Sequence, residues 1–218
     1  MTETTHIAYL FDPLCGWCYG ASAVIKKLAE QPGLVVELMP TGLFANERAP
    51  RMDDGFAAYA WANDQRIARL TGQTFSEDYR SKVLADRAAR LDSGPATLAL
   101  TAVSLTAPDR EIETLRAVQS ARYVGGHDIT SVEVLVQILR SLSLNEAAGL
   151  LQTSGPELVS ANQARLKRAQ SKMRQFHVDG VPVLVVSDGQ GERLISANGL
   201  IGDTNLVAKL SGEPAPSR

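Results

Sequence analysis

The chain has 218 residues, of which 44% are hydrophobic and 21% charged, and its formal net charge is −2. This composition predicts a globular protein that can build a core without disulfide staples or a structural metal. Lys and Arg are scattered along the chain, which excludes the concentrated basic surface of a nucleic-acid-binding protein. We therefore expect no nucleic-acid partner.

Two features bear on location. No apolar run approaches the ~18 residues that a membrane span requires, so we expect no membrane partner. The N-terminal segment Met1 to His6 has no Lys or Arg, unlike the basic start of a secretory signal. If Met1 is the native start, this predicts a cytoplasmic location, where two cysteines are more often catalytic or metal-binding than a structural bridge.

The N-terminal part of the chain reads as a strand, a helix and a second strand. Residues 7–11 are almost continuously apolar, which is typical of a strand buried on both faces. An amphipathic helix follows, with apolar residues at i, i+3, i+4 and i+7, namely Ala21, Val24, Ile25 and Leu28. The apolar run at 34–39 predicts the second strand, so the three elements indicate a βαβ unit.

The middle of the chain is predicted to be helical almost throughout. Asp53 or Asp54 can cap the first of these helices, and Thr130 followed by Glu133 fits a capping box. Further helix starts are expected at Ser93, Asp109, Asn145 and Pro156.

Strand patterns return near the C-terminus. Residues 181–186 and 192–196 predict two strands, and Asp188-Gly189-Gln190-Gly191 between them predicts a hairpin turn. Asp203 is expected to cap a short terminal helix.

Strands at both ends with helices between them indicate a split domain. We expect residues 1–50 and 156–218 to form a discontinuous α/β domain, and residues 51–155 to form an all-helical insertion domain. No internal repeat or low-complexity tract favours another division.

Cys15 and Cys18 lie where the first strand passes into the helix. Two intervening residues bring both sulfurs onto the first helical turn, close enough to bridge with little strain. Free N–H groups and the macrodipole favour an anion at a helix start, and cysteines there have pKa values lowered to about 3.5–7.5. Because the thiolate attacks in disulfide exchange, we expect Cys15 to be the nucleophile and Cys18 to resolve the mixed disulfide.

The alternatives for these cysteines are two buried thiols or half of a metal site. Tetrahedral zinc needs four ligands, and the histidines, His6, His127 and His177, are not at ligand spacing. We therefore expect no metal and no cofactor. An iron–sulfur cluster shared by two chains is a less favoured alternative.

The element order and two short motifs resemble a known family. The segment Asp12-Pro13-Leu14 precedes Cys15-Gly16-Trp17-Cys18-Tyr19, and Gly180-Val181-Pro182 precedes the hairpin. Together they resemble the DsbA-like thioredoxin superfamily, and within it the cytoplasmic FrnE-like branch. This resemblance implies a thioredoxin-like fold interrupted by a large helical insertion. It also implies a thiol–disulfide oxidoreductase or isomerase acting on protein or peptide disulfides.

The resemblance implies further site residues. Pro182 would be a cis-proline facing the disulfide and would join Cys15 and Cys18 as the catalytic set. The backbone of Val181 before it would pair with an extended substrate.

Four other residues would bind substrate or support the site: Asp12, Gly16, Trp17 and Tyr19. Asp12 is equally suited to a proton relay and to a turn-forming cap before Pro13. Trp17 is suited to substrate contact or to simple packing. Tyr19 is better suited to helix packing than to a hydrogen bond at the site.

Two departures from the family pattern matter. Thioredoxin and DsbA carry a buried acid six positions before the first cysteine, where this chain has Tyr9. The proton acceptor for Cys18 is then Asp12, water or a residue of the insertion. The dipeptide Gly16-Trp17 lacks the histidine of DsbA, so one stabiliser of the thiolate is absent.

Two other functions stay open. Kappa-type glutathione transferases and hydroxychromene-carboxylate isomerases share the split fold but do not rely on a cysteine pair at the helix start. A redox-responsive adaptor that presents clients to a protease is the non-enzymatic alternative. The expected partners are protein or peptide disulfides, with glutathione as a further candidate.

Overall fold

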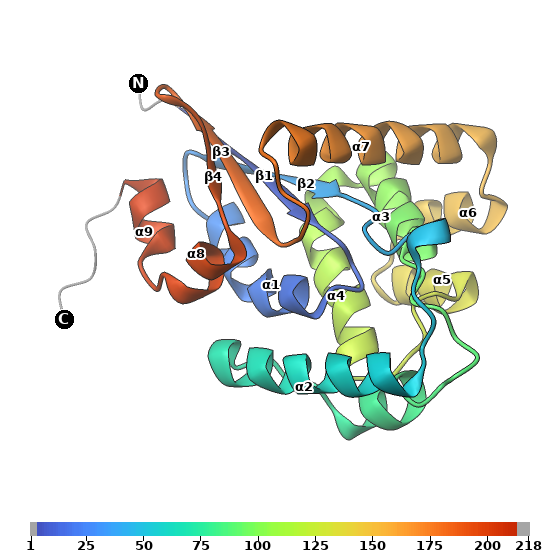
Figure 1. Ribbon diagram of the computed structural model, residues 1–218. Coiled ribbons are helices and arrows are strands. Elements are labelled where there is room, and N and C mark those ends of the chain that lie inside the picture. Colours follow the sequence, from blue (N-terminus) through green and yellow to red (C-terminus); the bar gives the residue numbers. More distant parts are fainter. Residues whose placement is uncertain (1–3, 213–218) are drawn as a thin grey trace.

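The computed structural model describes residues 4–212 (Figure 1). The expected absence of a secretory signal rests partly on residues 1–3, which lie outside the described residues. Between residues 4 and 212, no helix combines the length and the apolar character that crossing a membrane requires.

Four strands form one mixed sheet in the order β2-β1-β3-β4. β1 (Thr5–Phe11) is parallel to β2 (Leu34–Pro40) and antiparallel to β3 (Val183–Asp188), which pairs with β4 (Gly191–Ile195) as a hairpin. The parallel pairing requires a crossover, which α1 (Gly16–Ala29) supplies. The predicted βαβ unit and hairpin are confirmed.

Helices cover both faces of this sheet (Figure 1). On one face, α1 packs with α8 (Ala197–Gly202) and α9 (Leu206–Ser211). On the other face lies α7 (Pro156–Gln175), whose Ala169 packs against Leu10, Met39, Val183 and Val185. Side chains alternate between the faces of a strand, which is why β1 contributes to both cores.

The remaining helices lie beside the sheet and share a core of their own. They are α2 (Asp54–Thr71), α3 (Gly94–Thr106), α4 (Glu111–Tyr123), α5 (Val132–Ser141) and α6 (Asn145–Thr153). A π-helical turn, Tyr79–Val83, connects α2 and α3, and short 3-10 turns form at Asn46–Arg48 and Pro108–Arg110. The α/β fold class with a large helical part is confirmed, whereas the domain boundaries stay a prediction.

Several predicted helix and strand ends were wrong by a few residues. The third strand begins at Val183 and not at residue 181, because Pro182 has no N–H to donate to the sheet. The cap of α5 is Ser131 and not Thr130: the Ser131 hydroxyl accepts the Val134 N–H, while Thr130 bonds to Asp128.

Other differences lie at α4 and near the C-terminus. α4 begins at Glu111, after the 3-10 turn that contains Asp109. α9 has Asn205 at its N-cap, and the Asp203 carboxylate accepts the Asn205 N–H. α8 was not predicted.

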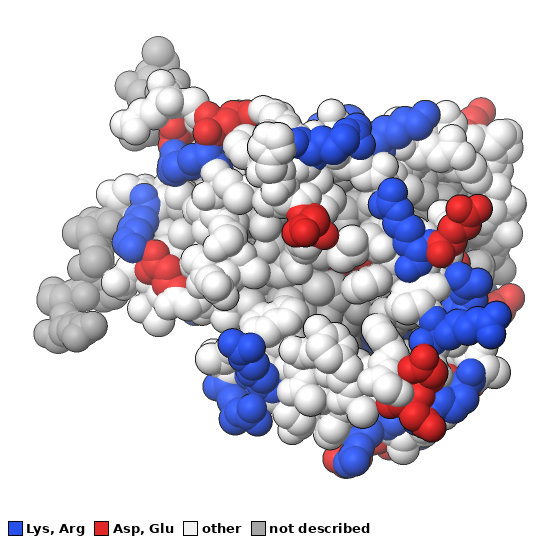
Figure 2. All heavy atoms as spheres, viewed as in Figure 1, with Lys and Arg blue, Asp and Glu red and all other residues white. Residues whose placement is uncertain are grey.

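Charged side chains are interspersed around the rim of the face shown in Figure 2. The centre of that face, between α2 and α7, carries few of them.

Candidate active site

Cys15 and Cys18 are free thiols at the start of α1. Cys15 is the N-cap residue, with extended backbone angles (φ −83°, ψ 119°), and its carbonyl accepts the Tyr19 N–H at 3.0 Å. Cys18 lies one turn further in and is fully buried, whereas the Cys15 side chain keeps 8% of its exposure. The helix therefore presents only the first thiol to the site.

Burial also affects the protonation of Cys18. Burial raises the pKa of the Cys18 thiol well above its ordinary value, and the neighbouring Cys15 raises this pKa further. Cys15 lies at the N-cap position of α1 and lines the open side of the site. The arrangement suits Cys15 to attack and keeps Cys18 protonated until a later step.

The proline loop faces Cys15 across the site. The Val181–Pro182 peptide bond is cis, as the resemblance implied. The Cys15 thiol donates a hydrogen bond to the Val181 carbonyl, with an Sγ–O distance of 3.6 Å. The fold thus brings together residues that lie 166 positions apart in the sequence.

Asp12 holds three segments together beneath the site. Its buried carboxylate accepts the Leu14 N–H at 2.9 Å, the Phe44 N–H at 3.1 Å and the Ser93 hydroxyl at 2.7 Å. Burial raises the pKa of Asp12, although these donors oppose the shift. The bond from Leu14 is the turn-forming cap, while the proton-relay role of Asp12 stays a prediction.

Tyr9 occupies the position where thioredoxin and DsbA carry an acid. Its hydroxyl donates to the Cys18 carbonyl at 3.2 Å, and its ring stacks on Phe11 at 5.1 Å. Burial raises the pKa of Tyr9 well above its ordinary value, and the two cysteine thiols raise it further. Tyr9 therefore stays protonated and cannot accept a proton from Cys18 at neutral pH.

Tyr19 packs within an aromatic cluster beside the cysteines, and its hydroxyl donates to the Thr74 carbonyl at 3.2 Å. Its ring stacks on Tyr123 with centroids 4.7 Å apart and meets the edge of Phe75 at 5.2 Å. The Tyr123 hydroxyl donates to the Leu14 carbonyl at 2.7 Å, which anchors the residue before Cys15. The cluster thus fixes the loop that carries the exposed thiol.

Gly16 and Trp17, between the cysteines, meet α2. A Cβ at Gly16 would collide with the Asp64 carboxylate, so glycine permits the close approach of the two helices. Trp17 is half-buried, and the Arg66 guanidinium lies 5.6 Å from its ring centroid. Trp17 therefore both packs against α2 and borders the site.

Two charged residues at the site were missed by the sequence analysis. Asp64, 4% exposed, accepts the Tyr79 hydroxyl at 3.0 Å, and burial raises its pKa to about 7. Arg122, 2% exposed, lies over the rings of Tyr79 and Tyr123 at 5.4 and 5.7 Å. A charged residue on the buried stripe of a helix was the available signal, since Asp64 precedes Ile67 by three and Arg122 follows Val118 by four.

These residues surround a cavity of about 310 Å³ beside Cys15. Trp17, Phe56, Tyr59 and Val181 contribute apolar walls, whereas Cys18 is not part of the lining. Its volume and few polar groups are typical of a small-molecule pocket. Within residues 4–212, no group of three His, Cys, Asp or Glu side chains could hold a metal ion.

A sequence profile of the DSBA-like thioredoxin domain matches residues 6–202. The chain belongs to the DSBA-like thioredoxin domain family. This confirms the predicted family and fold, while the narrower resemblance to the FrnE-like branch stays a prediction. No curated protein matches the sequence.

Solved structures of DsbA-like proteins are similar over nearly the whole chain. Cytosolic disulfide reductase DsbM from Pseudomonas aeruginosa has a TM-score of 0.82 and 29% identity, covering 94% of this chain and 95% of that one. The structure of DsbM with GSH has a TM-score of 0.80 and 30% identity, covering 94% of this chain and 96% of that one. A candidate protein disulfide isomerase from Nitrosomonas europaea has a TM-score of 0.73 and 25% identity, covering 94% of this chain and 98% of that one.

A more distant structure shares the fold alone. It is 2-hydroxychromene-2-carboxylate isomerase, with a TM-score of 0.63, 14% identity and coverage of 94% of this chain and 95% of that one. The family and the nearer structures together assign this DSBA-like protein to the thiol–disulfide oxidoreductases.

Proposed function

We propose that this protein reduces disulfides in proteins or peptides, with Cys15 as the attacking thiolate and Cys18 as the resolving thiol. The observation that carries the proposal is the unequal placement of the two thiols. Cys15 occupies the N-cap position of α1 and lines the same cavity as Val181, whereas Cys18 is fully buried. Pro182, whose loop faces Cys15, completes the proposed catalytic set.

The reaction follows from this placement. The Cys15 thiolate attacks one sulfur of the substrate disulfide, forms a mixed disulfide and releases the first substrate thiolate, which takes up a proton. Cys18 then loses its proton and attacks the Cys15 sulfur. A Cys15–Cys18 disulfide forms, and the second substrate thiol leaves. Two electrons have passed from the cysteine pair to the substrate.

Asp12 is the proposed proton acceptor for Cys18. Burial and Cys15 are the larger causes of the raised Cys18 pKa; a hydrogen bond to the Asp12 backbone lowers this pKa, and the Asp12 charge raises it. Tyr9, the other polar side chain beside Cys18, stays protonated for the reason given above. An acid that favours the protonated thiol can also receive its proton when the mixed disulfide is resolved.

Substrate docking is proposed along the proline loop. The Val181 carbonyl that now accepts the Cys15 thiol can bond instead to the backbone of an extended peptide. Trp17 and Tyr59 border the same cavity, and Tyr59 is 68% exposed. Their rings offer apolar contact area to residues flanking the substrate cysteine.

A small thiol would return the pair to its reduced state. Two molecules of glutathione can reduce the Cys15–Cys18 disulfide and leave as glutathione disulfide, which balances the electrons. The DsbM structure with GSH supports glutathione as this partner, and the cytosolic location of DsbM supports a cytoplasmic one. A glutathione-dependent transferase or isomerase, or a protease adaptor, is less favoured because neither needs both thiols.

The direct test is reduction of insulin disulfides with glutathione as the electron donor. We expect Cys15→Ser to abolish turnover, and Cys18→Ser to slow it and to accumulate a mixed disulfide on Cys15. A Cys15→Ser variant as active as the parent would contradict the proposal. Client binding without any disulfide turnover in the parent would favour the adaptor.

A further inference from the structure

Arg122 carries a buried charge that lacks an ionic partner. It is 2% exposed, and within residues 4–212 no carboxylate oxygen lies within 4.0 Å of its guanidinium. Its Nε has no hydrogen-bond partner, and the charge rests on the rings of Tyr79 and Tyr123. Burying an unpaired charge is costly, so a group at this position is better explained by a ligand that pairs with it.

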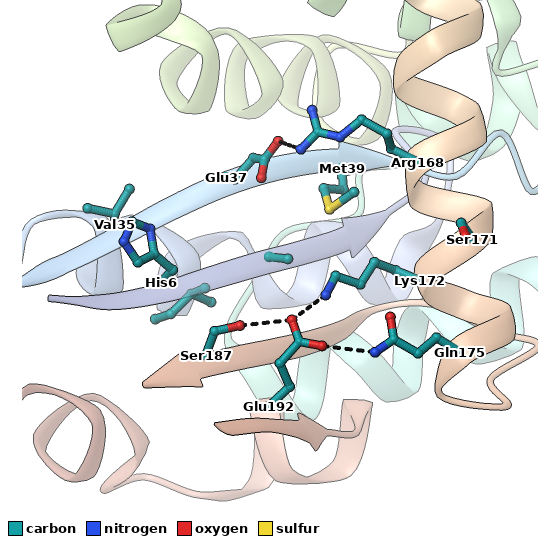
Figure 3. A pocket seen from close by; sticks show the side chains of 12 residues that line it. His6, Val35, Glu37, Met39, Arg168, Ser171, Lys172, Gln175, Ser187 and Glu192 are labelled. Carbon is teal, nitrogen blue, oxygen red and sulfur yellow. Dashed lines mark hydrogen bonds and ion pairs between the residues drawn. The ribbon is translucent and has the colours of Figure 1, made fainter. Parts of the chain in front are cut away.

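A second groove differs from the cavity beside Cys15 because its charged side chains are paired with one another. It lies between the sheet and α7, and Figure 3 shows its charged side chains bound to one another. Arg168 pairs with Glu37, and Lys172 pairs with Glu192, which also accepts the Gln175 amide at 2.9 Å. These charges are satisfied by the protein itself. The unpaired cation lies in the cavity beside Cys15, which Arg122 lines.

The same cavity carries an acid close to this cation. Asp64 and Arg122 both line it, and Tyr79 lies between them: its hydroxyl donates to Asp64 while its ring faces the guanidinium. The charge of Arg122 lowers the pKa of Asp64 against the larger effect of burial. Among the described residues, no ion pair within 4.0 Å joins these two side chains. The cavity wall therefore presents one acid and one cation, separated by a hydroxyl group.

We propose that this cavity binds the α-amino-acid end of a small peptide thiol, with the ligand carboxylate on Arg122 and the ligand ammonium on Asp64. An arginine binds a carboxylate through two parallel hydrogen bonds, and a buried carboxylate binds an ammonium through a charge-assisted bond. The γ-glutamyl end of glutathione has this pair of charges on one carbon. The inference rests on the proposed function, because the bound thiol would serve to recycle Cys15 and Cys18.

Binding is best measured with ligands that cannot exchange disulfides. Calorimetry on the reduced wild-type protein compares S-methylglutathione with two truncated forms, S-methyl-γ-glutamylcysteine and S-methylcysteinylglycine. We expect the first two to bind with similar affinity. The third, which lacks the γ-glutamyl group, should bind at least about tenfold more weakly.

Variants locate the two charges. Arg122→Gln and Asp64→Asn should each weaken S-methylglutathione at least about tenfold and leave the weak S-methylcysteinylglycine unchanged. Arg168→Gln, in the groove of Figure 3, is the matched control and should bind S-methylglutathione like the parent. Should Arg122→Gln fail to fold, the ligand series on the wild-type protein still decides.

The proposal is overturned if S-methylcysteinylglycine binds as tightly as S-methylglutathione, or if folded Arg122→Gln keeps the parent affinity. Insulin reduction by the wild-type protein with dithiothreitol, an uncharged donor, tests the proposed function separately. Turnover with dithiothreitol but no preference for γ-glutamyl ligands would contradict the proposed subsite and support the oxidoreductase function.

Discussion

The Asp64 carboxylate lies directly against the Cα of Gly16, so closely that a Cβ at this position would collide with it. Gly20, one turn further along α1, meets α2 in the same way, since a Cβ there would lie 2.6 Å from Ile67 Cγ2. α2 thus packs onto the start of α1 through two glycines. This packing brings an acid of the helical region against the residue that follows Cys15.

Gly16→Ala tests this contact. The added methyl group must displace Asp64 or shift α2, so we expect a loss of about 1–3 kcal/mol in the free energy of unfolding. In an Asp64→Ala background, Gly16→Ala should lower the free energy of unfolding by less. Urea unfolding of the parent, the two single variants and the double variant gives this difference as a coupling energy. Gly149→Ala, in α6 with open space around it, is the control and should stabilise by about 0.5–1 kcal/mol. Gly16→Ala as harmless as Gly149→Ala would contradict the packing.

Asp64 should also make stability depend on pH. Its folded pKa of about 7 lies above the ordinary value of 3.8, so the folded state holds this proton more tightly than the unfolded state. The contribution is fully present below pH 3.8 and is lost as pH rises through 7. The upper limit of the loss is about 4 kcal/mol, from about 1.4 kcal/mol per unit of pKa.

Asp64→Asn is the matching variant. The groups that face this side chain are the Tyr79 hydroxyl, which an Asn oxygen can still accept, and the Arg122 charge. We expect the variant to lose stability less steeply than the parent between pH 5 and 8, as followed by urea unfolding. Glu146→Gln, at an exposed position of α6, should track the parent. Parallel curves for Asp64→Asn and the parent would show that Asp64 is not buried as described.

Much of the sheet could be predicted because its signals are local. The apolar run before Asp12 and the turn at Gly189 and Gln190 each specify an element within a few residues. The pairing of Cys15 with the proline loop came from the resemblance to a family, since the two segments lie 166 positions apart. Periodicity alone could not have placed Val181 against a thiol.

Asp64 and Arg122 could not be predicted, because burial of a charge depends on tertiary contacts that no single helix displays. In the sequence of α2, Asp64 resembles a solvated residue. It is buried because Gly16 has no side chain and lets the two helices approach closely. The predicted N-cap of α5 was wrong for a different reason. Thr130 and Ser131 are neighbours with similar capping ability, and Asp128 binds Thr130 and leaves Ser131 to cap α5.

The proposed role of Asp12 predicts a kinetic effect. Asp12→Asn should slow resolution of the mixed disulfide at least about tenfold, because an amide cannot accept the Cys18 proton. The first reaction of Cys15 should change less. Rapid-quench analysis of a glutathione mixed disulfide separates the two steps.

Tyr9→Phe is the control for Asp12→Asn. It removes the hydroxyl that bonds to the Cys18 carbonyl and leaves the acid in place. We expect a stability loss of about 1 kcal/mol and nearly normal resolution. A normal rate of mixed-disulfide resolution in Asp12→Asn would contradict this role of Asp12 and indicate water as the proton acceptor.

The central claim is that Cys15 alone is the accessible nucleophile of the pair. Pulsed alkylation of the reduced protein with iodoacetamide at pH 7, followed by peptide mapping, measures the reactivity of each thiol. Because Cys15 occupies the N-cap position of α1 and lines the cavity while Cys18 is fully buried, we expect Cys15 to be labelled at least about tenfold faster. Labelling of Cys18 at the same rate as Cys15, or ahead of it, would contradict the assignment of roles.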